Sequence, residues 1–161
     1  MSNKQKIMLV SHGMDGISKI HDCGLYMGNA ACAKNIKTLK QHKITHVLNC
    51  ATELETHHTL YDSTFTYMSL SLEDSFDDNL KMHLPTAIEF IDNAIKNGNR
   101  VLVHCSKGIS RSGSLVVAYL MYKYELEYDD ALKIAKKGRS CCNPNFNFKN
   151  QLETFDFKLL T

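Results

Sequence analysis

The sequence of 161 residues lacks the features that would place it in a membrane, outside the cell or on a nucleic acid. No apolar run approaches the roughly 20 residues of a membrane-spanning helix, and Ile7–Val10 is too short for the apolar core of a secretory signal. A formal net charge of +2 is too small to indicate nucleic-acid binding. We therefore expect a cytoplasmic protein, with the nucleus as a second compatible compartment and neither membrane nor nucleic acid as a partner.

The cysteines lack the spacing of a disulfide scaffold or a zinc site. The chain has six of them but no Cys-x-x-Cys pair, and the adjacent Cys141 and Cys142 have no partners at ligand spacing. Thiols stay reduced in the cytoplasm, so we expect free cysteines. The sequence predicts neither a metal site nor any other cofactor.

Length and composition are those of one folded domain. Contents of 43% hydrophobic and 22% charged residues are typical of a soluble globular protein, and 161 residues are enough to bury a core. We expect residues 1–20 to form an N-terminal arm with a short strand near Ile17–Ile20, and residues 21–161 to form a single domain. The oligomeric state is left open.

Apolar patterns alternate between short runs typical of strands and longer stretches with helical spacing. Strands are predicted at 25–27, 45–50, 65–70 and 101–103, and helices over 30–42, 85–97, 113–121, 130–137 and around 148–159. Residues 51–64 and the acidic, flexible-looking 74–79 are predicted loops. Asp129 is expected to cap a helix. A stripe at helical spacing is expected to pack in the core: Phe148, Leu152, Phe155 and Leu159.

Strands interleaved with helices indicate an α/β fold, in which a mainly parallel central sheet is flanked by helices on both sides.

The strand at 101–103 leads into the stretch with the most specific chemical pattern, His104-Cys105-Ser106-Lys107-Gly108-Ile109-Ser110-Arg111-Ser112. Gly108 lets the backbone turn back on itself, and the apolar run 113–121 indicates a buried helix directly after the loop.

Such a loop forms a site for an anion. The N–H groups of the loop and of the helix N-terminus converge on one point, and Arg111 can add a bidentate fork. The predicted phosphate-binding residues are Ser106, Lys107, Gly108, Ile109, Ser110 and Arg111. Cys105 lies inside this positive potential, which stabilises a thiolate, and a thiolate under a bound phosphate is placed for in-line attack on phosphorus.

The pattern His104-Cys-x-x-Gly-x-Ser-Arg-Ser112 resembles the HCxxGxSRS signature of the cysteine-based dual-specificity protein phosphatases. Further blocks of that family resemble residues 24–29 (GLYMGN), 44–49 (ITHVLN), 118–121 (AYLM) and 143–152 (NPNFNFKNQL). Many members have Ala where this chain has Lys107, which changes the charge near the mouth of the site. The resemblance implies a small, catalytic-domain-only member with a protein tyrosine phosphatase-like fold, a phosphocysteine intermediate and no metal.

The resemblance also implies the remaining roles. A carboxylic acid must protonate the leaving oxygen, and Asp74 lies at the family's spacing from Cys105, with Asp77 as the second choice. Ser112 corresponds to the hydroxyl that eases departure of the sulfur in the second step. His104 is expected to orient the loop, with a merely structural role as the alternative.

The implied substrate is a phosphorylated protein, which the sequence does not specify further. A chain this short leaves little room for a deep pocket, so phosphoserine and phosphothreonine should enter together with phosphotyrosine. Arg139 matches a basic position that flanks the pocket in a small family member. With Lys107, Lys136 and Lys137 it is predicted to hold a second phosphate or acidic residues that flank the phosphorylated one, against the alternative of a solvated helix end. Cys50 is a candidate for a reversible disulfide with Cys105, against the alternative of a buried apolar residue.

Three other functions stay open. One is hydrolysis of a phosphoinositide, a glycan phosphate or an RNA 5′-phosphate, although lipid-directed relatives usually carry Lys where this chain has Ser106 or Ile109. Another is a non-catalytic phosphopeptide-binding module, although such proteins typically lose the Cys or the Arg. The third is sulfur transfer of the rhodanese type, whose loop is generally shorter than the Cys-x5-Arg found here.

Overall fold

The computed structural model describes residues 16–160, apart from the side chains of 55–58, and is built around one sheet. Its five strands lie in the order β1-β2-β5-β3-β4. Their bounds are β1 (Ile17–His21), β2 (Leu25–Gly28), β3 (His46–Asn49), β4 (Thr66–Ser69) and β5 (Val101–His104). Neighbouring strands from β2 to β4 run parallel, whereas the edge strand β1 is antiparallel to β2. The predicted mainly parallel sheet is confirmed.

Strand β1 brings the end of the predicted N-terminal arm into the sheet. It confirms the strand expected near Ile17–Ile20 and pairs with β2 from Ile17 opposite Gly28. Residues 1–15 lie outside the described residues, so the arm and its boundary to the domain stay predictions.

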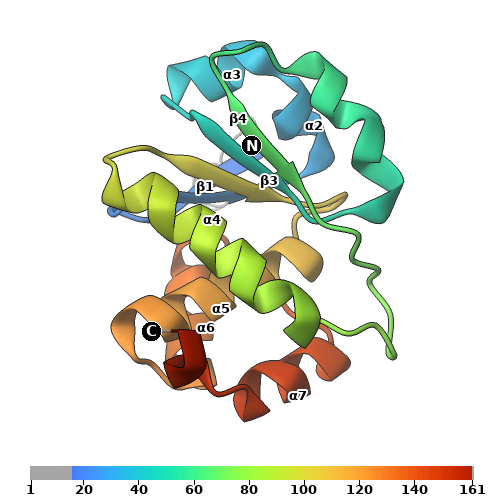
Figure 1. The fold of residues 1–161 in the computed structure, drawn as a ribbon, viewed down its shortest axis with the longest axis vertical. Helices are drawn as coiled ribbons and strands as arrows, with labels where there is room; N and C mark the ends of the chain where they lie inside the picture. The colour runs from blue at the N-terminus through green and yellow to red at the C-terminus, as the bar shows by residue number, and fades with distance from the viewer. Residues whose placement is uncertain (1–15, 161) are drawn as a thin grey trace, which may run out of the picture.

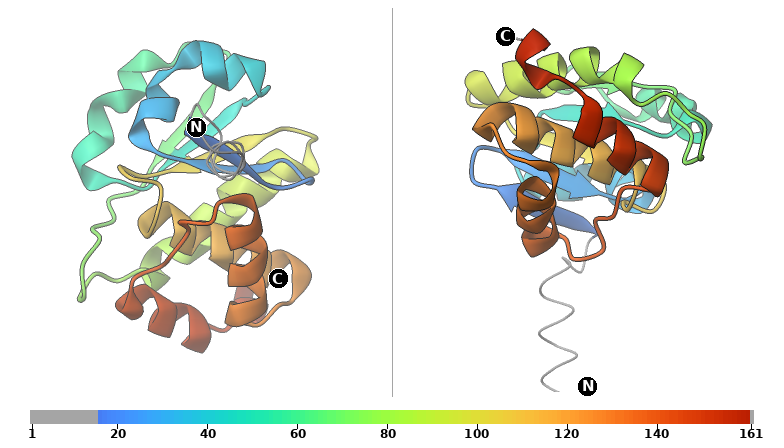
Figure 2. Two further views of the ribbon diagram at one scale, coloured as in Figure 1. Left: turned by 180° about the vertical axis from the view of Figure 1, so that it is seen from behind. Right: turned by 90° about the horizontal axis from the view of Figure 1, so that it is seen from below.

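Helices cover both faces of the sheet (Figure 1, Figure 2). On one face, α2 (Ala30–Lys34) and α3 (Ile36–Gln41) enclose a small core that includes Leu39 and Leu102. The larger core includes Val101 and Val103, which alternate with Leu102 along β5. The helices that contribute to it are α4 (Leu84–Lys96), α5 (Arg111–Tyr124), α6 (Tyr128–Gly138) and α7 (Phe146–Thr154). The predicted flanking of the sheet on both sides is confirmed.

Helix α5 is the central helix of the larger core. Its residues Arg111–Met121 are all buried, and it starts directly at the end of the loop that follows β5. The apolar run predicted this helix from residue 113, but its first turn is made by Arg111 and Ser112. Both side chains are therefore fixed relative to the loop by a helix whose first eleven residues are all buried.

Two predicted elements differ in the structure. The helix expected over 30–42 is two short helices, because the Asn35 side chain accepts a hydrogen bond from the Thr38 N–H and starts α3 afresh. The loop expected over 51–64 contains the 3-10 helix η1 (Thr52–Leu60). Its sequence has too few apolar residues to show helical periodicity.

The C-terminal helices also begin and end differently from the prediction. The N-cap of α6 is Glu127, and Asp129 lies in the first turn, where its charge favours the helix dipole. Phe148 and Leu152 are buried in α7 as expected. Because α7 ends at Thr154, Leu159 lies in the separate turn η3 (Phe157–Leu160) and is 78% exposed, so its predicted core position is wrong.

Asp92 on α4 ties that helix to α5. The residue is 5% exposed, accepts a hydrogen bond from Tyr119 Oη at 3.0 Å, and pairs with Lys96 Nζ at 2.6 Å and Lys123 Nζ at 3.3 Å. Burial raises the pKa of the Asp92 carboxyl, but the hydrogen bonds from Lys96, Tyr119 and Lys123 together lower it below its ordinary value.

We expect Asp92→Asn to destabilise the protein at neutral pH by about 1–3 kcal/mol, because two lysines lose their charged partner. The folded-state pKa of Asp92 lies below the unfolded one, so the carboxylate stabilises the fold above about pH 4 and this contribution fades at lower pH. Urea unfolding of both proteins at several pH values measures this, with the exposed Asp130→Asn as control. A difference that stays constant down to pH 3 would contradict it.

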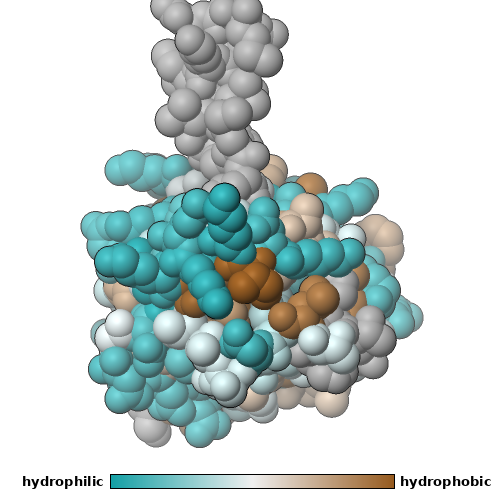
Figure 3. Space-filling model, turned by 90° about the horizontal axis from the view of Figure 1, so that it is seen from above, coloured by the Kyte–Doolittle hydropathy of each residue, from teal (hydrophilic) through white to brown (hydrophobic). Residues whose placement is uncertain are grey.

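The described part of the chain shows neither a membrane-spanning helix nor a cluster of metal ligands. Among residues 16–160, no helix is both long and apolar enough to cross a membrane. In the same part of the chain, no three His, Cys, Asp or Glu side chains gather as they would around a metal ion. The face over α2 and α3 is mainly hydrophilic, with a small hydrophobic patch near its middle (Figure 3).

Candidate active site

The loop 105–110 joins β5 to the first turn of α5, as the sequence predicts. Gly108 has a φ of +68°, a conformation that favours glycine. A Cβ at this position would lie 2.6 Å from the carbonyl oxygen of Gly28 in β2. Glycine is therefore required here both by the backbone conformation and by the close packing of the loop on β2.

The carbonyl groups of residues 106–110 all bind donors on the outer side of the loop. Backbone N–H groups donate to three of them: Ala30 to the Ser106 carbonyl at 2.9 Å, Asn143 to Ile109 at 3.0 Å, and Ser114 to Ser110 at 2.8 Å. The Arg139 side chain donates to the other two, the carbonyls of Lys107 at 3.4 Å and Gly108 at 2.8 Å. A trans peptide unit places its N–H opposite its C=O. The N–H groups of Lys107 to Arg111 therefore face the inside of the loop, where none of them donates to an acceptor within residues 16–160. This is the geometry of an anion cradle.

Cys105 lies at the base of this cradle and is 2% exposed. Its Sγ lies 3.2 Å from the hydroxyl oxygen of Ser112, which is buried on the first turn of α5. His104 is buried at the end of β5, and its Nδ1 lies 3.4 Å from the Cys105 carbonyl oxygen. The structure thus brings these three residues together, while their chemical roles stay predictions.

Arg111 is held by Glu53, which is not among the site residues predicted from the sequence. Its Nη1 and Nη2 donate to Glu53 Oε2 and Oε1 at 2.6 and 2.7 Å, and Nη1 also donates to the Leu72 carbonyl at 3.3 Å. The hydrogen bonds of this ion pair lower the pKa of Glu53 and raise that of Arg111. Glu53 follows the end of β3, so the tendency of site residues to gather beyond the carboxyl ends of parallel strands would have pointed to it.

Asp74 lies on the loop that follows β4, and its Oδ1 accepts a hydrogen bond from Asn145 Nδ2 at 2.8 Å. It lies close enough to Arg111 to raise the pKa of that guanidinium, after the larger effect of Glu53. The backbone N–H of Asn145 also donates to Ser110 Oγ at 2.9 Å. One residue therefore contacts both the loop that carries Asp74 and the anion cradle.

The side chains of Asp77 and Asp78 bind groups within their own loop. Asp77 Oδ1 accepts a hydrogen bond from Ser75 Oγ at 3.0 Å. Asp78 accepts hydrogen bonds from the backbone N–H groups of Glu73 and Asn79 at 2.6 and 2.8 Å. These contacts favour Asp74 over Asp77 as the acid of the site.

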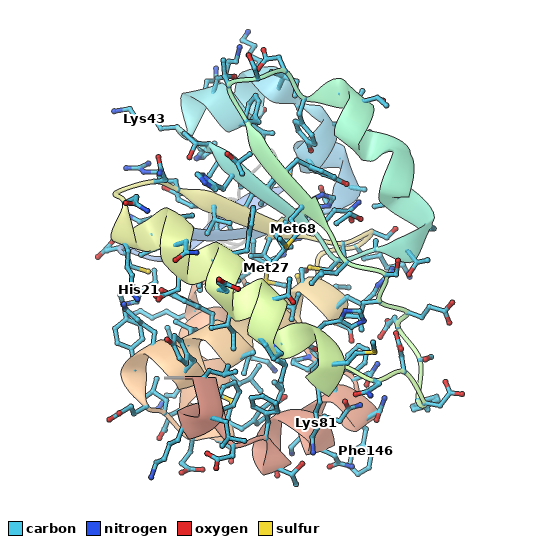
Figure 4. The ribbon with its side chains drawn as sticks, viewed as in Figure 1. His21, Met27, Lys43, Met68, Lys81 and Phe146 are labelled. Carbon is cyan, nitrogen blue, oxygen red and sulfur yellow. The ribbon has the colours of Figure 1, made fainter. Side chains whose placement is uncertain are left out.

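The loop that carries Asp74 is anchored to α7 rather than free. Asn147 Nδ2 donates to the carbonyls of Ser75 and Asp78 at 3.2 and 2.9 Å, and Gln151 Nε2 donates to the Asp78 carbonyl at 2.8 Å. Gln151 Oε1 in turn accepts a hydrogen bond from the Lys81 N–H at 3.0 Å. Lys81 and Phe146 lie at the end of the molecule where this loop reaches α7 (Figure 4). Side-chain amides therefore hold the loop in place relative to the cradle.

Arg139 does not lie at the mouth of the site, as its sequence position predicts. It follows α6, is 5% exposed, and its side chain lies behind the anion cradle. Its guanidinium donates to the carbonyls of Lys107, Gly108 and Gly16 and to Ser18 Oγ. A side chain with these contacts is neither beside a substrate nor a solvated helix end, so both predictions for Arg139 are wrong.

Cys50 lies beside Cys105 at the ends of neighbouring strands. Asn49 is paired with His104 in the sheet, and the Cys50 N–H donates to the His104 carbonyl at 2.8 Å. Cys50 is buried, and burial raises the pKa of its thiol well above the usual range. All six cysteines are free in the structure. A disulfide between Cys50 and Cys105 under oxidation stays a prediction.

Comparison with known proteins gives one consistent family. The family model described as "Dual specificity phosphatase, catalytic domain" matches residues 25–157. Protein phosphatase Slingshot of Drosophila melanogaster is 39% identical over 149 residues, which are 92% of this chain and 14% of Slingshot. Dual specificity protein phosphatase 22 of Homo sapiens is 36% identical over 148 residues, which are 88% of this chain and 74% of that protein.

A solved structure agrees with these sequence relatives. The crystal structure of DUSP15 has a TM-score of 0.80 to this chain at 35% identity, covering 88% of this chain and 87% of that one. The chain thus has about the extent of the DUSP15 chain in that crystal structure but spans only a small part of Slingshot.

Proposed function

The chain belongs to the dual specificity phosphatase catalytic-domain family, and we propose that it hydrolyses phosphotyrosine, phosphoserine and phosphothreonine in proteins through a phosphocysteine intermediate. The observation that carries the proposal is the cradle of inward-facing N–H groups around Cys105, with Arg111 at its edge. The names of the related proteins support phosphorylated protein as the substrate class.

In the first step, the Cys105 thiolate attacks phosphorus while the bond from phosphorus to the leaving oxygen breaks. The inward-facing N–H groups and Arg111 bind the other phosphate oxygens and stabilise the charge of the transition state. The carboxyl group of Asp74 gives its proton to the leaving oxygen. Because Asn145 donates to Oδ1, Oδ2 is the oxygen of Asp74 that carries this proton.

In the second step, water attacks the phosphorus of the phosphocysteine and gives a proton to the Asp74 carboxylate. The bond between sulfur and phosphorus breaks, and inorganic phosphate is the product. The Ser112 hydroxyl, 3.2 Å from Sγ, donates a hydrogen bond that stabilises the departing thiolate.

The test of this function uses peptides of one sequence that carry phosphotyrosine, phosphoserine or phosphothreonine, together with an aryl phosphate, all in the presence of EDTA. We expect phosphate release from all of them. An inactive protein that still binds the phosphopeptides would be a binding module instead. Hydrolysis confined to phosphoinositides, glycan phosphates or RNA 5′-phosphates would assign the chain to a non-protein substrate.

We expect Asp74→Asn to lower kcat for alkyl phosphoesters by about 10²-fold or more, because an unprotonated alkoxide leaves poorly. The basic limb of the pH profile should disappear at the same time, since the proton donor is missing. The matched control is Asp77→Asn, which removes a carboxylate from the same loop. The assignment would be wrong if Asp77→Asn, and not Asp74→Asn, lost the basic limb.

A further inference from the structure

Arg139 is a buried cation with neutral partners. Its Nε donates to the Gly108 carbonyl at 2.8 Å, its Nη2 to Lys107 at 3.4 Å, and its Nη1 to Gly16 at 3.2 Å and Ser18 Oγ at 3.1 Å. Within residues 16–160, no carboxylate is among these partners. A guanidinium stays charged in a protein, and burial of a charge without an opposite one costs free energy. A negative charge from outside this set of contacts would offset that cost.

The contacts of Arg139 orient two peptide units of the anion cradle. The carbonyls of Lys107 and Gly108 point at the guanidinium, so the N–H groups of the same peptide units, on Gly108 and Ile109, point into the cradle. The fit is close, because a Cβ on Gly108 would lie 2.7 Å from Arg139 Nη2. The other carbonyls of the loop bind uncharged donors: the N–H groups of Ala30, Asn143 and Ser114, and the Ser114 hydroxyl.

We propose that Arg139 is a positioning residue for the anion site, and that its counter-charge is the bound phosphate together with the Cys105 thiolate. It holds the N–H groups of Gly108 and Ile109 toward the phosphate and adds a second positive charge behind the loop. Arg111 supplies the first charge in front of it. This inference rests on the proposed function and adds a residue to it that does not touch the substrate.

Several other titratable or polar groups surround the site and are kept when Arg139 is replaced. They are Arg111 and Ser112 of α5, Cys50 beyond β3, Cys142 after α6, and Asp74 and Glu53, which act on Arg111. Arg139 also lowers the pKa of the Cys142 thiol, so a change measured in the Arg139 variants includes its effect through Cys142.

The test compares Arg139→Lys, Arg139→Gln and Arg139→Met with the wild type. Two quantities are measured on the full chain: inhibition by orthovanadate, and the pH at which Cys105 becomes reactive toward iodoacetamide. In the Gln and Met variants, we expect vanadate affinity to fall about tenfold and the reactivity midpoint to rise by about one pH unit. Arg139→Lys keeps the charge but loses the planar fork of the guanidinium. Its vanadate affinity and its reactivity midpoint should therefore lie between those of these variants and those of the wild type.

The matched control is Arg100→Met. Arg100 is a half-buried arginine at the start of β5 that donates to Tyr26 Oη at 2.9 Å and to the His42 carbonyl at 3.1 Å, at the opposite end of the strand from the cradle. This variant should leave both quantities unchanged. Far-UV circular dichroism and the urea midpoint of each variant show whether it is folded.

The proposal is overturned if folded Arg139→Met binds vanadate and titrates like the wild type. It is equally overturned if Arg139→Lys and Arg139→Gln lose the same affinity, because charge would then play no part. If Arg139→Met does not fold, the comparison of Arg139→Lys with Arg139→Gln tests the proposal by itself. Hydrolysis of an aryl phosphate by the wild type is measured in parallel, so that a failure of the proposed function is seen separately.

Discussion

Replacing Cys105 with serine abolishes hydrolysis of aryl phosphates and phosphopeptides, with an expected loss of at least about 10⁴-fold. A serine hydroxyl stays protonated at neutral pH, and the N–H groups of the cradle cannot ionise it as they stabilise a thiolate. The fold should survive, because the smaller oxygen occupies the same buried position 3.2 Å from Ser112 Oγ. Binding of a phosphopeptide should survive as well, since the cradle and Arg111 are unchanged.

The measurement combines initial rates with calorimetric titration of a phosphotyrosine peptide. Cys23→Ser is the matched control, because Cys23 is a half-buried cysteine in the turn between β1 and β2. It should keep wild-type rates. Substantial activity in Cys105→Ser would show that another group is the nucleophile, and the proposed mechanism would have to be abandoned.

The second large effect is expected for Arg111→Lys, which should lower kcat by about 10³-fold. Glu53 and the Leu72 carbonyl take both protons of Nη1 and one proton of Nη2. The Nε–H and the second N–H of Nη2 therefore remain, side by side on one edge of the guanidinium, for two phosphate oxygens. A lysine supplies a point charge without this fork, so the transition state loses a pair of parallel hydrogen bonds.

Steady-state rates for Arg111→Lys and Glu53→Gln separate the fork from its support. Glu53→Gln keeps the fork and removes the charged partner that orients it, so its loss of kcat should be smaller than that of Arg111→Lys. Wild-type kcat in Arg111→Lys would show that the guanidinium does not contact the transferred phosphoryl group. A larger loss for Glu53→Gln than for Arg111→Lys would instead give Glu53 a direct role in the reaction.

The sequence predicted those helices and strands whose apolar pattern and end signals lie within the element itself. The strand at Val101–Val103 and the helix that ends near Gly138 follow from short patterns of apolar residues and a stop signal. The break at Asn35 was missed because an asparagine within a helical pattern caps a new helix only when its side chain turns back to Thr38. Leu159 was misplaced because continuous spacing does not reveal that α7 ends at Thr154.

By itself, the sequence determined the anion cradle, because strand, glycine and helix start are neighbours along the chain and their backbone geometry follows from local conformation. It also determined that Cys105 and Arg111 lie at this cradle, because both belong to the same stretch of sequence. Tertiary structure alone decided which distant side chains meet there. Glu53 pairs with Arg111, Asn145 joins Asp74 to the cradle, and Arg139 turns inward behind the loop. The direction of a side chain depends on packing between elements far apart in the sequence, and no local pattern carries that information.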